Sequence, residues 1–228
     1  MKIGIIQAAS QKDKNQLLKK CVEQSVRGKE HEVVSFGVFP EEESHVSYVQ
    51  TAVLCSMLLG SGAVDFIVTG CSSGQGMMLA LNALPDVLCG FVQNPADAYL
   101  FGRINDGNAV AYPLGLSFGW AAEINLQSTM DALFSEEFGT GYPKMDAQRK
   151  KRDTMLLKEI ARSGKKKLWE IFTFSENGKN GHEEGCFGKD FYQEIFGRNN
   201  VCEYILEHGR GKQMMEFIKE GQNFISMR

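Results

Sequence analysis

The sequence contains no apolar run close to the roughly 20 residues that a membrane-spanning helix requires. It has no apolar leader either, because Met1 to Ile6 already has the pattern of a strand, so we expect no signal peptide. With a net charge of -3, the chain also lacks the basic excess that draws proteins to nucleic acids or anionic lipids. We therefore expect a cytoplasmic protein with no membrane or nucleic-acid partner.

The cysteines include no Cys-x-x-Cys pair, the spacing typical of structural zinc sites and redox motifs. They are scattered at positions 21, 55, 71, 89, 186 and 202, which does not make a disulfide framework. His182 and Cys186 lie close together, but two ligands are too few for a metal site. The cysteine pattern thus predicts reduced thiols and no zinc site.

Short apolar runs alternate with helical patterns over residues 1–134. This alternation predicts an α/β fold, a doubly wound (Rossmann-like) five-stranded parallel sheet with helices on both faces. The expected strands are 2–6, 32–36, 64–69, 87–92 and 109–112. The expected helices are 14–27, 49–59, 77–84, 95–104 and 118–134. At 228 residues and 43% apolar, the chain can bury one core and a small appendage.

Composition changes after the segment Gly139 to Pro143, where the chain becomes charged and helical in pattern. We therefore expect an α/β core over 1–143 and a helical C-terminal domain over 144–228, packed on the core or on a partner subunit. Its basic clusters, 149–152 and 165–167, are best interpreted as solvated helix faces. Residues 175–188 are expected to form a loop, followed by short helices near 190–196, 201–207 and 212–219.

The stretch from Val64 to Gly76 joins a strand to a small, flexible loop, Cys71-Ser72-Ser73-Gly74-Gln75-Gly76. Cys71 then lies at the carboxyl end of a central strand, before a helix that is apolar nearly all round, and ligands of open α/β sheets bind at that edge. Converging N–H groups and the helix dipole favour a thiolate there. Strand-end cysteines are often only core residues, but a packing cysteine does not need this loop.

The loop does not match a nucleotide-binding motif. Leu79 stands where a dinucleotide fingerprint has its third glycine, and no lysine completes a P-loop. The loop therefore suits a small anion or a hydroxylated ligand.

Three segments together resemble the type B ribose-5-phosphate isomerase family, which includes galactose-6-phosphate isomerase subunits. They are Cys71 to Gly76, Ala80-Leu81-Asn82 and Asn105-Asp106-Gly107-Asn108. The resemblance covers residues 1–143, and the remaining residues resemble an extra C-terminal domain found on one branch of that family.

The resemblance implies an aldose–ketose isomerase that works through a cis-enediolate without a cofactor. Cys71 fits the base that removes a proton from the carbon next to the carbonyl. Ser73 and the N–H groups of Ser72 to Gly76 fit the cradle for the oxygen that becomes negative. The resemblance also implies a homodimer with shared active sites, or a tetramer, in which the Asn105–Asn108 turn reaches a neighbour's site.

The chain departs from the family's phosphosugar pattern at several positions. Gln7-Ala8-Ala9-Ser10 stands in the region of an Asp-His pair, and Ile104 replaces the histidine that opens the sugar ring. The arginines that hold phosphate are replaced by Gly115, Tyr142 and, by approximate alignment, Asp146. Charge-assisted pairs are the strong contacts to phosphate, so their loss is significant.

A substrate that is already open-chain and carries no phosphate needs neither group. The departures therefore favour a ketol isomerase of a small sugar acid such as a 4-deoxy-5-keto-uronate. One alternative is a ribose-5-phosphate or galactose-6-phosphate isomerase, in which Lys144 or Arg149 could replace the arginines. The others are a non-catalytic sugar-binding relative and a flavodoxin-like phosphate or nucleotide module, since fold does not fix function.

The expected catalytic residues are Cys71 and Ser73. The expected substrate-binding residues are Ser10, Ser72, Gly74, Gln75, Gly76, Asn94, Tyr99, Asn105, Asn108 and Tyr142. Ser10, Gln75 and Asn94 could equally be helix or turn caps, and a tyrosine on a helix, such as Tyr99, is more often a core residue.

Overall fold

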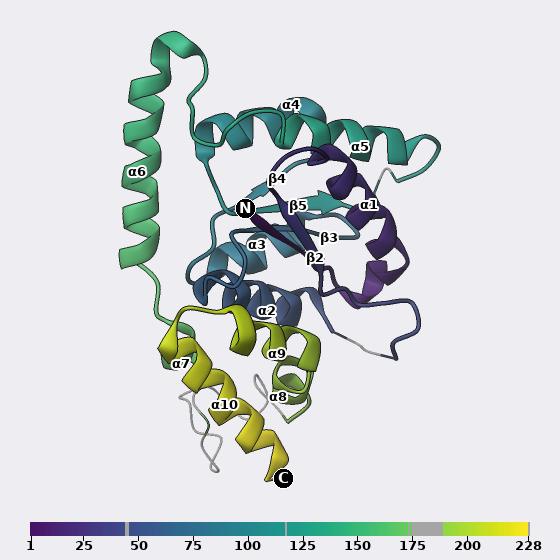
Figure 1. Cartoon of the computed structure of the whole chain (residues 1–228), viewed down its shortest axis with the longest axis vertical. Helices are drawn as coiled ribbons and strands as arrows, with labels where there is room; N and C mark the ends of the chain where they lie inside the picture. The colour runs from purple at the N-terminus through teal and green to yellow at the C-terminus, as the bar shows by residue number, and fades with distance from the viewer. Residues whose placement is uncertain (44–45, 117, 173, 175–188, 228) are drawn as a thin grey trace.

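A single parallel sheet forms the centre of the molecule (Figure 1). The structure is a computed structural model and describes residues 1–43, 46–116, 118–172, 174 and 189–227. The strand order is β2-β1-β3-β5-β4 and all neighbours pair in parallel. The strands are β1 (Lys2–Ile5), β2 (Glu32–Ser35), β3 (Phe66–Cys71), β4 (Cys89–Phe91) and β5 (Ala109–Pro113). Every residue of the central strand β3 is buried, as expected of a strand covered on both faces.

Helices cover both faces of this sheet, so the doubly wound α/β fold is confirmed (Figure 1). One face carries α1 (Asn15–Ser25), α4 (Pro95–Leu100) and α5 (Ala122–Leu133). The other carries α2 (Tyr48–Gly60) and α3 (Gln75–Ala83). The described chain also has three short helical segments: the 3-10 helices η1 (Ala9–Lys14) and η3 (Lys144–Asp146) and the π-helix η2 (Phe101–Asn105).

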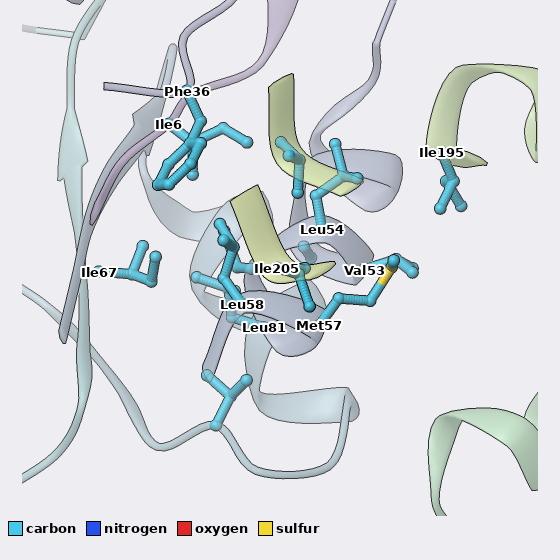
Figure 2. Close-up of a cluster of buried hydrophobic side chains, with 14 of the residues drawn as sticks. Ile6, Phe36, Val53, Leu54, Met57, Leu58, Ile67, Leu81, Ile195 and Ile205 are labelled. Carbon is cyan, nitrogen blue, oxygen red and sulfur yellow. The ribbon is translucent and has the colours of Figure 1, made fainter. Parts of the chain in front are cut away.

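Side chains alternate along the strands and so divide the core into two clusters. Phe66 and Val68 of β3 pack toward α1 and α5, where they meet Leu126. Ile67, between them, packs toward α2 and belongs to the other cluster (Figure 2). The alternation therefore fixes which face of β3 each helix covers.

All of the C-terminal helices except the first share the cluster to which Ile67 belongs. The C-terminal helices are α6 (Ala147–Ser163), α7 (Leu168–Ile171), α8 (Lys189–Phe196), α9 (Asn199–His208) and α10 (Lys212–Ser226). Ile205 of α9 lies beside Leu54 and Leu58 of α2, and Ile195 of α8 belongs to the same buried cluster (Figure 2). Helices α8 and α9 thus pack on α2 and α10 packs on α8 and α9, whereas α6 runs beside the body of the molecule (Figure 1).

Some details differ from the sequence-based expectation. Strand β3 extends to residue 71, so Cys71 ends the strand instead of lying in the loop. The helix after it is not buried all round, because Leu79 is 65% exposed and only Met77 and Leu81 are buried. Helix α7 was not expected, α5 begins four residues late, and α10 runs on to residue 226. The expected loop 175–188, with His182 and Cys186, lies outside the described residues.

Within the described part of the chain, no helix is both long and apolar enough to cross a membrane.

Candidate active site

Cys71 lies at the carboxyl end of β3, where the strand order reverses. The chain runs from β1 outward to β2 and then returns to β3 on the other side of β1. In open α/β sheets this switch point leaves a crevice beyond the strand ends in which ligands bind. The Cys71 residue is 8% exposed, so it is buried but not completely sealed.

The loop after Cys71 is tied to the end of β5. Leu114 N–H donates to the Cys71 carbonyl at 2.9 Å, and Gly115 and Leu116 N–H donate to the Ser72 carbonyl at 2.9 and 2.6 Å. A Cβ on Gly115 would lie 3.1 Å from the Ser72 Cα. Glycine at 115, an expected phosphate-arginine position, therefore allows the close approach that fixes this loop.

Gly74 gives the loop its turn into α3. Its φ is +75°, and a Cβ there would lie 2.7 Å from Phe91 Cε2. Among the described residues no side-chain hydrogen bond caps the helix that follows, so the first N–H groups of α3 remain free to bind an oxygen. A Cβ on Gly76 would lie 3.4 Å from the Tyr48 ring. Of the other loop residues, Gln75 is exposed and Ser73 is partly buried.

A side chain that sequence reasoning missed bridges the switch point. Gln11, in the turn after β1, donates from Nε2 to the Ser72 Oγ at 2.9 Å. Its neighbour Ser10, the residue we expected in the site, is exposed. The available signal was only that both polar residues follow β1, at the edge where Cys71 lies, and the sequence does not show which of the two faces inward.

Buried polar atoms without partners cluster in the segments around this bridge. Both polar side-chain atoms of Gln7, Gln11 Oε1, Asn15 Nδ2 and Thr69 Oγ1 are buried and have no hydrogen-bond partner among the described residues. Gln7 and Asn15 flank the turn after β1, and Thr69 precedes Cys71 by two residues. Because such atoms are costly to bury unpaired, water or a polar ligand is expected beside them.

The other described cysteines lie in different surroundings. Burial raises the pKa of the Cys21, Cys55, Cys89 and Cys202 thiols, that of Cys202 to about 12. A raised pKa keeps a thiol protonated and unreactive at neutral pH. Among the described residues, no group of three or more His, Cys, Asp or Glu side chains is placed to hold a metal ion.

A ribose/galactose isomerase family model matches residues 3–141, well over half of the chain. The chain belongs to the ribose/galactose isomerase family. It is a sugar isomerase, an enzyme that interconverts aldoses and ketoses. A comparison of this chain with curated protein sequences found no match.

Two solved structures are similar to this isomerase along almost its whole length. A 4-deoxy-L-threo-5-hexosulose-uronate ketol-isomerase, complexed with a tartrate, is 36% identical with a TM-score of 0.86, over 98% of this chain and 100% of that one. A ribose-5-phosphate isomerase from Vibrio parahaemolyticus is 28% identical with a TM-score of 0.82, over 97% and 99%. The type B enzyme from Trypanosoma cruzi, 20% identical with a TM-score of 0.60, covers 72% of this chain and 99% of its own, and shows the same fold.

Two predicted residues of this isomerase, Tyr99 and Tyr142, contact each other. Their rings meet edge to face with centroids 5.8 Å apart, and the Tyr99 hydroxyl donates to Glu136 Oε1 at 3.3 Å. The Arg103 guanidinium lies 5.4 Å from the Tyr99 ring centre. Within the described residues, no hydrogen bond joins this aromatic pair to the Cys71 loop.

Asn94 caps a helix, one of the two roles considered for it. Its Oδ1 accepts from the Asp97 N–H at 3.0 Å, and Pro95 follows at the first helical position. The cap satisfies that oxygen without a ligand.

The Asn105–Asn108 turn precedes β5 and therefore lies at the edge of the sheet opposite Cys71. Asn108 Oδ1 accepts from the Leu88 N–H and its Nδ2 donates to the Asp86 carbonyl, both at 2.8 Å. Strand β5 separates the two edges by roughly 15 Å at about 3.3 Å per residue. Within one subunit the turn is thus held away from Cys71.

Proposed function

We propose that this isomerase acts on an open-chain, unphosphorylated sugar acid of the 4-deoxy-5-keto-uronate type, with Cys71 as the base. The observation that carries the proposal is that the polar side chains around Cys71 at the switch point are neutral hydroxyl and amide groups. Gln11 and Ser72 form the one described side-chain bridge there. The 36% identity to a ketol-isomerase of such a uronate supports the same substrate class.

Two basic residues in the turn after β1 already have partners. Lys12 Nζ donates to the Glu42 carbonyl at 2.7 Å, and Lys14 pairs with Asp13 at 2.9 Å. Arg149, considered as a replacement for the missing arginines, pairs with Asp146 and Asp153 at 3.4 and 3.1 Å. A phosphate dianion would have to draw any of these three cations away from its partner, whereas the carboxylate of a uronate carries only one negative charge.

The chemistry follows from a base and a cradle at one strand end. The Cys71 thiolate takes the proton from the carbon next to the carbonyl, and the electron pair left behind forms the double bond of a cis-enediolate. The carbonyl oxygen becomes negative and is stabilised by the Ser73 hydroxyl and the free N–H groups at the start of α3. The thiol then returns its proton to the former carbonyl carbon while the hydroxyl proton of the neighbouring carbon moves to the other oxygen.

An open-chain substrate also explains the residue at position 104. Its side chain is isoleucine, which carries no proton, and its carbonyl accepts from the Thr154 hydroxyl at 2.6 Å. A substrate that is already linear needs no acid to open a ring.

We further propose that the active enzyme is a homodimer with shared sites. The Asn105–Asn108 turn lies at the amino-terminal end of β5, so it does not reach the Cys71 of its own subunit. A second copy would bring its turn, and with it the Tyr99–Tyr142 pair, to the crevice.

The substrate assignment is tested by comparing kcat/KM for a 4-deoxy-5-keto-uronate and for ribose 5-phosphate. We expect the phosphosugar to be at least about 100-fold poorer, because two missing charge-assisted hydrogen bonds at about 1.5 kcal/mol each amount to that factor. The second candidate, a phosphosugar isomerase, is favoured by the similarity to the Vibrio parahaemolyticus enzyme. Equal or better turnover of ribose 5-phosphate would establish it in place of our proposal.

A further inference from the structure

We propose that Gln11 determines substrate specificity by orienting the Ser72 hydroxyl as a donor toward the substrate and by offering its own Oε1 as an acceptor. This inference rests on the proposed function, since it names the groups that would recognise an open-chain sugar acid. The Ser72 hydroxyl would donate to a carbonyl or carboxylate oxygen of the substrate, and Gln11 Oε1 would accept from a neighbouring hydroxyl. Neither group is charged.

Gln11 is held in place by its backbone. It has φ −132° and ψ 27° inside η1, which breaks the helical path of that turn, and its N–H donates to the Ala8 carbonyl at 3.0 Å. The residue is 8% exposed. At this kink the Gln11 side chain is buried and reaches Ser72, although such a side chain would ordinarily lie in solvent.

The direction of the hydrogen bond decides what Ser72 can do. Its Oγ accepts from Gln11 Nε2 at 2.9 Å. A hydroxyl has one proton, and that proton must then point to another oxygen. Ser72 is exposed and follows Cys71 directly, and its carbonyl is fixed by Gly115 and Leu116. The O–H of Ser72 is therefore free to donate to a ligand at the strand end that carries the sulfur.

The other atom of the Gln11 amide provides the acceptor. Gln11 Oε1 is buried and has no partner among the described residues. Gln7, Asn15 and Thr69 carry further unpaired buried atoms in the adjoining segments, which independently indicate that a polar ligand or water completes this region. Donor and acceptor together make a neutral recognition pair.

The test reverses the donor by Gln11→Glu. A carboxylate accepts hydrogen bonds only, so the Ser72 proton would turn to residue 11 and away from the substrate. We expect kcat/KM for the 4-deoxy-5-keto-uronate to fall roughly 10- to 100-fold, chiefly through KM, because a misdirected donor near a charge costs about 1.5–3 kcal/mol. Gln16→Glu, on the exposed side of α1, adds the same charge and is expected to leave kcat/KM unchanged.

Gln11→Met separates positioning from charge. It removes the hydrogen bond at similar volume and is expected to lower kcat/KM about tenfold. If Gln11 acts partly through Ser72, the Gln11→Met/Ser72→Ala double variant loses less than the sum of the two single losses, whereas independent structural effects would add. Additive losses, or wild-type KM in Gln11→Glu while the wild type isomerises the uronate, would overturn the inference and leave the proposed function standing.

Binding of gluconate, an open-chain sugar acid, decides the case if the wild type does not isomerise the uronate. Calorimetry should then still show about tenfold weaker binding by Gln11→Glu than by the wild type and Gln16→Glu. Equal affinities, or no gluconate binding by the wild type, would overturn the role of Gln11.

Discussion

Cys202 has no exposed surface in the cluster between α9 and α2, and burial raises the pKa of its thiol to about 12. Cys55 and Cys89 also lie in that cluster with raised pKa values. Cys71 belongs to its edge, where β3 ends beside a loop of free N–H groups. At the scale of single residues, position distinguishes the proposed base from chemically identical groups.

Alkylation tests this distinction. With iodoacetamide at pH 8 and peptide mass spectrometry, we expect Cys71 to be modified faster than Cys55, Cys89 and Cys202, whose thiolates are scarce when the pKa is raised. Cys202 labelled as fast as Cys71 in the native protein would contradict it.

The Cys202 pKa also predicts how stability changes in alkali. Its folded value of about 12 lies above the ordinary 9.0, so the contribution is present below pH 9 and lost as pH rises toward 12, at up to about 1.4 kcal/mol per pH unit. Between pH 8 and 10.5, urea denaturation under reducing conditions should show the wild type losing about 2 kcal/mol more than Cys202→Ala. Parallel losses in both proteins would contradict the raised pKa.

At the scale of elements, the site is one strand-loop-helix unit, β3 to α3, tied to the end of β5. Its local pattern was sufficient to predict the strand, the glycine loop and the position of Cys71. The bridge from Gln11 was not predictable, because it joins residues 61 apart in sequence and depends on a kink in η1. Asn94 shows the same limit, since only the geometry shows that it caps α4.

Gly74→Ala tests whether the loop between β3 and α3 needs its glycine, and Gly28→Ala is the matched control. Both glycines have positive φ, +75° and +77°, but a Cβ at Gly28 has nothing within 4 Å, whereas at Gly74 it meets Phe91 at 2.7 Å. Each should lose about 1 kcal/mol from backbone strain, and Gly74→Ala about 1–3 kcal/mol more from overpacking. Only Gly74→Ala should also lower kcat, because it displaces the loop. Equal denaturation midpoints and equal kcat would contradict this.

At the scale of the whole molecule, two kinds of contact attach the C-terminal helices to the core, apolar packing and a set of hydrogen bonds. Their apolar side chains extend the cluster beneath α2. Arg198 adds a polar clamp: Nη1 donates to Glu42 Oε2 at 2.9 Å and Nη2 to the Phe36 carbonyl at 2.8 Å and the Gly37 carbonyl. The sequence indicated the helices but not this attachment, because contacts across more than 150 residues leave no local pattern.

Replacing Arg198 by Met should destabilise the chain by about 3 kcal/mol, because it leaves the Glu42 carboxylate and the Gly37 carbonyl without this donor, while the Phe36 carbonyl keeps Asn200 Nδ2. Glu42→Gln keeps a hydrogen-bonding group of the same shape and should cost only about 1 kcal/mol. Arg198→Lys should lie between them, since an ammonium lacks the planar fork of a guanidinium. Denaturation midpoints give this order, and a loss below about 0.5 kcal/mol for Arg198→Met would show that the clamp contributes little.

The central claim is that the Cys71 sulfur moves the proton between adjacent sugar carbons. Proton NMR of the 4-deoxy-5-keto-uronate reaction in deuterium oxide tests it most directly. The account predicts that the thiol proton exchanges with solvent before it is returned, so the wild type places deuterium on the former carbonyl carbon of the product. Cys71→Ala should isomerise and exchange at least about 1000-fold more slowly, although that variant still binds gluconate. Isomerisation with deuterium incorporation at the wild-type rate by Cys71→Ala would contradict it.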